Sequence, residues 1–242
     1  MDFKRKLEAR DVGLTVVFAA LYVVLSFLPL SQVIGFFGKS ITVATVVAPV
    51  IGLILGAYLG LFSAFLGGII SLFVSPNFSL PSLFAGAVAA LCAGLLYRGK
   101  QGFCAVVYLL LLVTYGFYPF IGAFWLYPLV MWFQIFGFIV LISPLQSLAS
   151  KNFNSNSNPR LLFAFLITCL TSTLASQIAG SLAFEILFQD PDFLKGIWQL
   201  TIFIYPIERV FIAVSAALIG ASLYKTLKRT NFMPFNEENT KT

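Results

Sequence analysis

Residues 52–68, "GLILGAYLGLFSAFLGG", place a small side chain at every fourth position. The small residues are Gly52, Gly56, Gly60, Ala64 and Gly68, and the series extends back through Ala48 to Ala44. Positions four apart share one face of a helix, so the series predicts a smooth face that a neighbouring backbone can approach closely. Whether this region folds as one helix or two decides the topology of the whole chain.

Composition indicates an integral membrane protein. The chain has 242 residues, of which 60% are hydrophobic and 10% are charged. Apolar runs of about 20 residues recur along it, and each is long enough to cross a bilayer core. The first run follows a basic segment but has no small-residue cleavage pattern, so we expect it to be retained. We therefore predict a single transmembrane domain over residues 1–242, multi-pass in the cell membrane.

The charge and cysteine content exclude several classes of function. The net charge is +6, and most of the lysines and arginines lie in short loops and tails beside apolar runs. Membrane topology accounts for that placement better than nucleic-acid binding does. Cys92, Cys104 and Cys169 sit in apolar runs without ligand-like spacing, and the chain contains no histidine. We therefore expect no metal site, no cofactor and no disulfide framework.

Length sets the number of predicted spans. Six apolar runs are unambiguous: 12–30, 79–97, 103–122, 126–148, 161–187 and 198–224. Residues 41–74 as a single helix would extend about 50 Å, well beyond the bilayer core. We therefore predict two short helices, 41–57 and 58–74, with a break between Gly56 and Gly60. The fold class is an all-α helix bundle of about eight spans.

Charge placement tests the same topology independently. With the N-terminus in the cytoplasm, eight spans place the basic residues near 98–100, near 151–160 and in the tail on the cytoplasmic side. The acidic loop "QDPDFLKG" (189–196) then falls outside. This satisfies the positive-inside bias and predicts that both termini are cytoplasmic.

Polar and aromatic side chains concentrate toward the predicted outer half. They are Tyr118, Trp125, Tyr127, Gln134, Gln177, Glu185, Glu208 and Arg209, together with the outward-facing Lys39 and Asn77. The inner halves contain mainly Ala, Gly, Ser, Leu and Ile. A pore would need a polar path through the whole membrane. This asymmetry therefore favours an aromatic-lined pocket that captures a small solute from outside.

Each candidate also has a structural interpretation. Tyr118, Trp125 and Tyr127 are equally typical of the interfacial aromatic belt. The two glutamines are equally typical of hydrogen bonds between helices, and Glu185 is consistent with a position at the water boundary.

Glu208 and Arg209 are harder to explain as structural residues. Adjacent helix positions point roughly 100° apart, so we expect that the two side chains do not face each other. Each then needs its own partner, a water-filled cavity or a ligand. Pro206 is expected to loosen the helix there and to free a carbonyl group.

Four stretches together carry a family resemblance. They are "GLTVVFAALYVVLS" (13–26), "APVIGLILGAYLGLFSAFLGGIISLF" (48–73), "PSLFAGAVAALCAGLLYRGK" (81–100) and "YPIERVFIAVSAALIGASLYKTL" (205–227). The chain resembles the substrate-binding S components of energy-coupling factor (ECF) transporters, which typically have six spans. The resemblance implies that the chain captures a vitamin or similar micronutrient. It also implies a transmembrane coupling subunit and cytoplasmic ATPase subunits as partners.

The same resemblance implies a contact surface for the coupling subunit. The family uses small residues in the first span, often Ala-x-x-x-Ala. The nearest match here is Thr15-x-x-x-Ala19, with Ala20 adjacent. The chain has no Walker A pattern, so any energy from ATP would come from partners.

Two other classes of function stay open. A self-sufficient proton-coupled transporter would use Glu208 as its coupling group and the helices 41–57 and 58–74 as a broken element. A membrane-embedded enzyme would need clustered acid–base groups, and its only outer carboxylates are Glu185, Asp190, Asp192 and Glu208. We expect no catalytic residues and no enzymatic activity.

Overall fold

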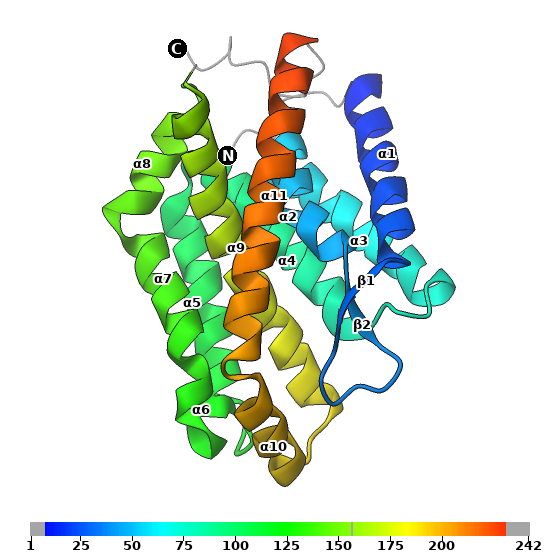
Figure 1. Ribbon diagram of the computed structural model, residues 1–242, viewed down its shortest axis with the longest axis vertical. Coiled ribbons are helices and arrows are strands. Elements are labelled where there is room, and N and C mark those ends of the chain that lie inside the picture. Colours follow the sequence, from blue (N-terminus) through cyan, green and yellow to red (C-terminus); the bar gives the residue numbers. More distant parts are fainter. Residues whose placement is uncertain (1–7, 156, 231–242) are drawn as a thin grey trace.

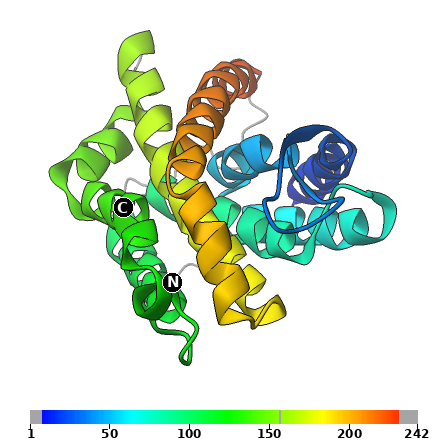
Figure 2. The same ribbon diagram turned by 60° about the horizontal axis from the view of Figure 1, so that its bottom comes forward.

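Helices make up nearly all of the regular structure in the computed structural model, which describes residues 8–155 and 157–230. The helices are α1 (Ala9–Ser26), α2 (Ala44–Leu55), α3 (Ala57–Val74), α4 (Leu80–Tyr97), α5 (Gln101–Phe117), α6 (Ala123–Leu126), α7 (Trp132–Ile142), α8 (Pro144–Asn152), α9 (Asn158–Leu187), α10 (Pro191–Thr201) and α11 (Ile204–Arg229). A 3₁₀ turn, η1, spans Pro128–Met131, and two short strands are β1 (Pro29–Gln32) and β2 (Ser40–Thr42). Figures 1 and 2 show α9 and α11 running through the middle, with α5–α8 on one side and α1–α3 on the other.

Five of these helices are long and apolar enough to cross a membrane: α1, α3, α4, α9 and α11. The bent pair formed by residues 128–142 and 144–152 passes the same test as one unit, and α2 and α5 are shorter apolar helices. The predicted all-α helix bundle is confirmed, and these helices are consistent with a membrane protein. Each of the eight predicted ranges contains a helix or part of a helix pair.

The break in the region 41–74 lies at Gly56, within the predicted interval. Gly56 has φ 79° and ψ 177°, a backbone conformation that essentially only glycine adopts. A β-carbon built at Gly60 would lie 2.8 Å from Cα of Gly52, so these two residues meet across the break. The chain therefore reverses direction at Gly56, and α2 and α3 form a tight helical hairpin.

The small-residue stripe brings helix backbones into direct contact, as predicted. All of α2 is buried, and a β-carbon added at Gly52 would overlap the carbonyl group of Ala90 in α4. A β-carbon added at Gly94 of α4 would likewise overlap the backbone of Ala57 at the start of α3. Side chains larger than hydrogen cannot fit at these crossings, so glycine sets the spacing of the α2–α3–α4 core.

The predicted span 126–148 is interrupted. α7 ends at Ile142 and α8 begins at Pro144, and the bend across this point is 61°. Proline lacks the backbone N–H that would continue the helix, and its ring clashes with the preceding turn. The Ser143 hydroxyl accepts a hydrogen bond from the Leu145 N–H and so caps the new helix.

The stretch 189–196, predicted as a loop, belongs instead to a helix. Asp190 caps α10 by accepting hydrogen bonds from the N–H groups of Asp192 and Phe193, and Pro191 occupies the first helical position. α10 ends at Thr201, and α11 begins only at Ile204. The predicted span 198–224 is therefore two helices with a break at residues 202–203. Pro206 lies in the first turn of α11, where it frees no internal carbonyl.

The connection between α1 and α2 forms an antiparallel hairpin of β1 and β2 that sequence analysis does not predict. A β-carbon added at Gly35, between the strands, would crowd the side chain of Ile197, so the hairpin loop lies against α10. The Ser31 hydroxyl donates a 2.9 Å hydrogen bond to Oε2 of Glu208 in α11. The hairpin is thus held against the last two helices.

Candidate functional site

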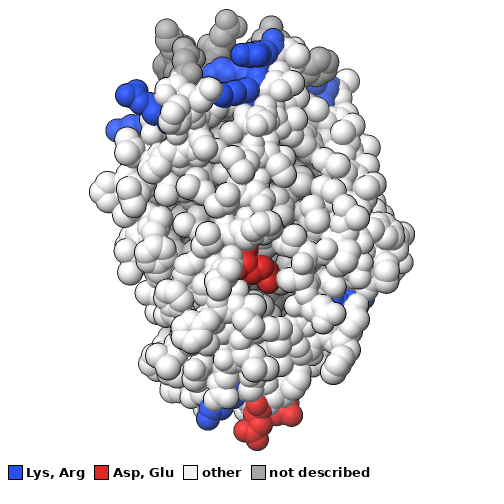
Figure 3. Space-filling model, in the orientation of Figure 1, with Lys and Arg blue, Asp and Glu red and all other residues white. Residues whose placement is uncertain are grey.

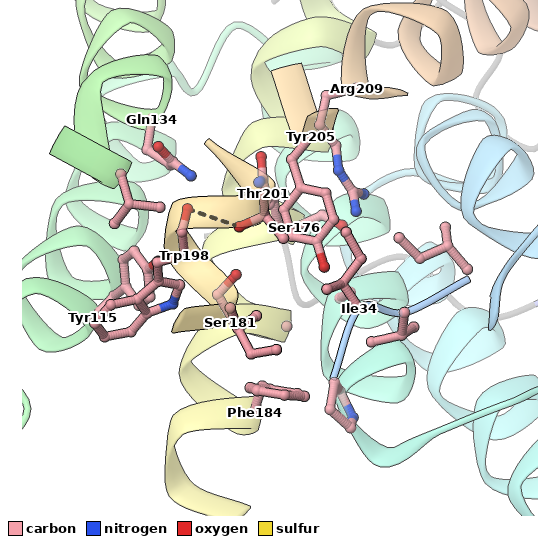
Figure 4. A pocket seen from close by; sticks show the side chains of 18 of the residues that line it. Ile34, Tyr115, Gln134, Ser176, Ser181, Phe184, Trp198, Thr201, Tyr205 and Arg209 are labelled. Carbon is pink, nitrogen blue, oxygen red and sulfur yellow. Dashed lines mark hydrogen bonds between the residues drawn. The ribbon is translucent and has the colours of Figure 1, made fainter. Parts of the chain in front are cut away.

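A cavity of about 80 Å³ lies where the hairpin, α9, α10 and α11 meet. Val33, Ile34 and Ile41 of the hairpin cover one side, and the first turns of α4 contribute Ser82 and Ala85. Figure 4 shows labelled side chains from several elements converging on this space. The cavity has room for several water molecules or one small organic solute.

One part of the cavity wall is aromatic. Tyr115 of α5 and Trp198 of α10 meet edge to face, with ring centroids 6.1 Å apart. Phe184 and Tyr205 add two more rings, and the Tyr205 hydroxyl reaches the backbone of Ile34 in the hairpin. Flat aromatic faces of this kind stack well against a flat, unsaturated ligand.

A second part of the wall carries polar atoms that make no hydrogen bond to any of the described residues. They are Oε1 of Gln134, Oγ of Ser176, Oε1 of Gln177 and Nε of Arg209, all on buried residues that line the cavity. Buried polar atoms are normally hydrogen-bonded, and leaving one unsatisfied costs about 1–3 kcal/mol. Four of them around one space leave several hydrogen bonds that a polar ligand could make.

Glu208 and Arg209 form an ion pair, contrary to the expectation that they face apart. Nη2 of Arg209 lies 3.2 Å from Oε1 of Glu208, and both side chains are at most 10% exposed. The 100° argument fails because it considers only where the side chains leave the helix, whereas both chains are long enough to curl toward each other. Arg209 lines the cavity, whereas Glu208 lies behind it and is also bound by Ser31.

Three of the predicted site residues line the cavity: Gln134, Gln177 and Arg209. They come from α7, α9 and α11, which lie far apart in the sequence. Figure 4 shows Gln134 and Arg209 on opposite sides of the space, with Thr201 between them. Sequence analysis finds these three residues because a polar side chain is costly to bury in a membrane.

The other predicted site residues do not line the cavity: Lys39, Asn77, Tyr118, Trp125, Tyr127, Glu185 and Glu208. The Lys39 ammonium and the Asn77 amide donate to backbone carbonyls of Pro76 and Phe27, so both hold connecting segments together. Trp125 is 56% exposed and packs edge to face on Phe117. Tyr118 and Tyr127 are half-buried in the same connection between α5 and η1.

Glu185 is a separate feature of α9. It is 0% exposed, and neither carboxyl oxygen has a hydrogen-bond partner in the described protein. Glu185 is therefore enclosed by protein rather than exposed to water, and its depth in the membrane stays a prediction. It lies near Tyr115, whose hydroxyl hydrogen-bonds the Ser181 side chain at the cavity.

Sequence analysis overlooks Tyr115, Trp198, Thr201 and Tyr205 as lining residues. Leu194, Trp198 and Thr201 are the buried residues of α10, and their spacing is that of one helix face. This spacing predicts a helix from the sequence alone, but the acidic residues at 190 and 192 are equally typical of a loop.

The expected coupling surface on α1 is mostly turned inward. Thr15 and Ala19 are buried against α3, where the Ser63 hydroxyl donates to the Thr15 carbonyl and Gly67 approaches the Ala19 backbone. Ala20 is exposed. Glycine and serine of α3 pack on that face, so Thr15 and Ala19 are covered by this chain itself, and their contact with a partner stays a prediction.

Comparison of the chain with protein-family models, with curated proteins and with solved structures finds no match. In the described part of the chain, no group of three or more His, Cys, Asp or Glu side chains is placed to hold a metal ion.

Proposed function

We propose that this protein is a membrane-embedded substrate-capture subunit, similar to the S component of an ECF-type uptake transporter. In this proposal it binds a vitamin or similar small solute in the cavity bounded by the hairpin, α9, α10 and α11. The observation that carries the proposal is the set of four unsatisfied polar atoms, on Gln134, Ser176, Gln177 and Arg209, around one aromatic-walled space. A concave site with aromatic walls and a few convergent polar groups is typical of small-molecule binding.

We further propose a multi-pass orientation in the cell membrane, with eight membrane-embedded segments and both termini in the cytoplasm. Its support is the charge distribution. In Figure 3 most of the visible basic side chains gather at the end where α11 finishes, whereas acidic side chains lie beside a basic one at the opposite end, near α10. The positive-inside rule assigns the basic end to the cytoplasm. The hairpin and α10 then lie toward the exterior, so solute would enter from outside.

The proposed partners are a transmembrane coupling subunit and cytoplasmic ATPase subunits. Since Thr15 and Ala19 face α3, the part of α1 left for such a contact is the exposed side that includes Ala20, Val16 and Val17. This side is apolar and suits either lipid or a membrane partner.

Native mass spectrometry of the gently purified protein tests the capture function. We expect a co-purifying small molecule on wild-type protein, its loss from Ser176→Leu and its retention on Ser222→Leu. Ser176 lines the cavity, and a leucine there would fill much of the space. Ser222 is exposed on α11, so Ser222→Leu makes the same substitution away from the cavity. A solute that persists in Ser176→Leu would show that the cavity does not hold it.

A proton-coupled carrier is the second candidate, and Glu185 favours it. A buried carboxyl without a hydrogen-bond partner is costly as an anion and is typical of proton relays in transporters. We expect proteoliposomes that contain only this chain to show no solute accumulation driven by a pH gradient. Accumulation that Glu185→Gln abolishes would establish the carrier and would contradict the capture subunit.

A further inference from the structure

The charge balance of the cavity bears on the kind of solute it holds. Among the described lining residues, Arg209 is the one charged side chain. Its charge is already compensated, because Nη2 lies 3.2 Å from Oε1 of Glu208. Oε2 of Glu208 accepts a hydrogen bond from the Ser31 hydroxyl, whereas Oε1 makes the ion-pair contact without a hydrogen bond. The ion pair therefore adds no net charge to the cavity wall.

Neutrality matters because the ion pair is largely buried. Arg209 and Glu208 side chains are 7% and 10% exposed. An uncompensated charge in such surroundings carries a large desolvation penalty. A solute with a net charge would leave one charge unpaired, whether anion or cation. An uncharged solute would leave the ion pair intact.

The unsatisfied atoms specify the hydrogen bonds that remain to be made. Nε of Arg209 is a donor, so it needs an acceptor such as a carbonyl oxygen. Oε1 of Gln134 and Oε1 of Gln177 are acceptors, so they need N–H or O–H groups. Ser176 can take either role. The Tyr115, Trp198, Tyr205 and Phe184 rings lie around the same space.

We infer that the captured solute is an uncharged, flat heterocycle with a carbonyl acceptor directed to Arg209 and N–H or O–H donors directed to Gln134 and Gln177. This inference rests on the proposed capture function and adds the chemical class of the substrate. The small cavity limits the enclosed part to about one ring, since a typical pocket for a larger ligand measures about 300 Å³ or more.

Four probes on a single pyridine ring separate the possibilities. Nicotinamide is uncharged and offers both a carbonyl and N–H donors, whereas 3-acetylpyridine keeps the carbonyl and loses the donors. Nicotinate is an anion, and 3-(aminomethyl)pyridine is a cation at neutral pH. Ligand-observed NMR titrations on purified wild-type protein, with Ser176→Leu as the blocked reference, give each affinity.

We expect nicotinamide to bind wild-type protein at least about tenfold more tightly than the other three probes. Glu208→Gln leaves the Arg209 charge uncompensated, so in this variant nicotinate is expected to overtake nicotinamide. A wild-type preference for nicotinate or for the amine overturns the inference and leaves the capture function standing. Equal binding of 3-acetylpyridine and nicotinamide also overturns it, because the glutamine oxygens would then make no contact.

The co-purifying solute decides the case in which no probe binds. If mass spectrometry identifies an uncharged heterocycle, the inference is supported, and if it identifies a charged molecule, the inference is overturned. If wild-type protein neither carries a solute nor binds any probe better than Ser176→Leu does, the proposed function fails, and the inference fails with it.

Discussion

Gly52→Ala is expected to destabilise the protein by about 3 kcal/mol, although it adds only one methyl group. The added β-carbon would overlap the backbone carbonyl of Ala90, which cannot rotate away as a flexible side chain could. α2 and α4 must then separate, and the buried contacts between them are lost together. Unfolding in detergent micelles, followed by circular dichroism against denaturant, measures the change.

Gly13→Ala is the matched control. Gly13 also lies inside a helix, α1, but a β-carbon there has no neighbour within 4 Å. Alanine is the better helix former, so this variant should gain about 0.5–1 kcal/mol. If Gly52→Ala behaved like Gly13→Ala, the close crossing of α2 and α4 would not exist in the folded protein.

The chain reversal at Gly56 is a feature of this fold that can be predicted from the sequence. Length and charge placement require a break in residues 41–74, and glycine spacing locates it. The Ser143–Pro144 bend and the Asp190 cap of α10 are local signals of the same kind. Hydropathy obscures the bend, because the apolar run continues through it. The acidic residues obscure α10, because charge outside a membrane is equally typical of a loop.

The candidate site is predictable only in part, and the reason is physical. Gln134, Gln177 and Arg209 can be found because a polar side chain at depth needs a partner. Aromatic residues carry no such signal, since a ring is stable both at the interface and in a cavity. Trp125 and Trp198 therefore look alike in the sequence, although one is exposed and the other lines the cavity.

The ion pair adds a further limit on sequence reasoning. The predicted depth of Glu208 and Arg209 indicates that their charged side chains are costly to bury. It does not indicate that the two charges neutralise each other. The hairpin supplies Ser31 to the same carboxylate from 177 positions away in the sequence. A contact so distant along the chain depends on how the whole bundle packs, so no local pattern reports it.

Arg209→Ala is expected to cost about 3–5 kcal/mol of stability, because it leaves Glu208 as a buried, unpaired charge. The same change removes the Nε donor from the cavity. Loss of a hydrogen bond from a charged donor, worth about 1.5–3 kcal/mol, corresponds to a loss of solute affinity of about 10- to 150-fold. Arg229→Ala, at the exposed end of the same helix, should leave both properties unchanged.

The double variant Glu208→Gln with Arg209→Ala separates the two effects. Neutralising Glu208 removes the unpaired charge, so most of the stability should return. Solute binding should stay weak, because the donor is still missing from the cavity wall. Denaturant unfolding and the solute occupancy seen by native mass spectrometry report the two quantities independently. If binding recovers together with stability, Arg209 acts only through the packing of α11, and its contact with solute is ruled out.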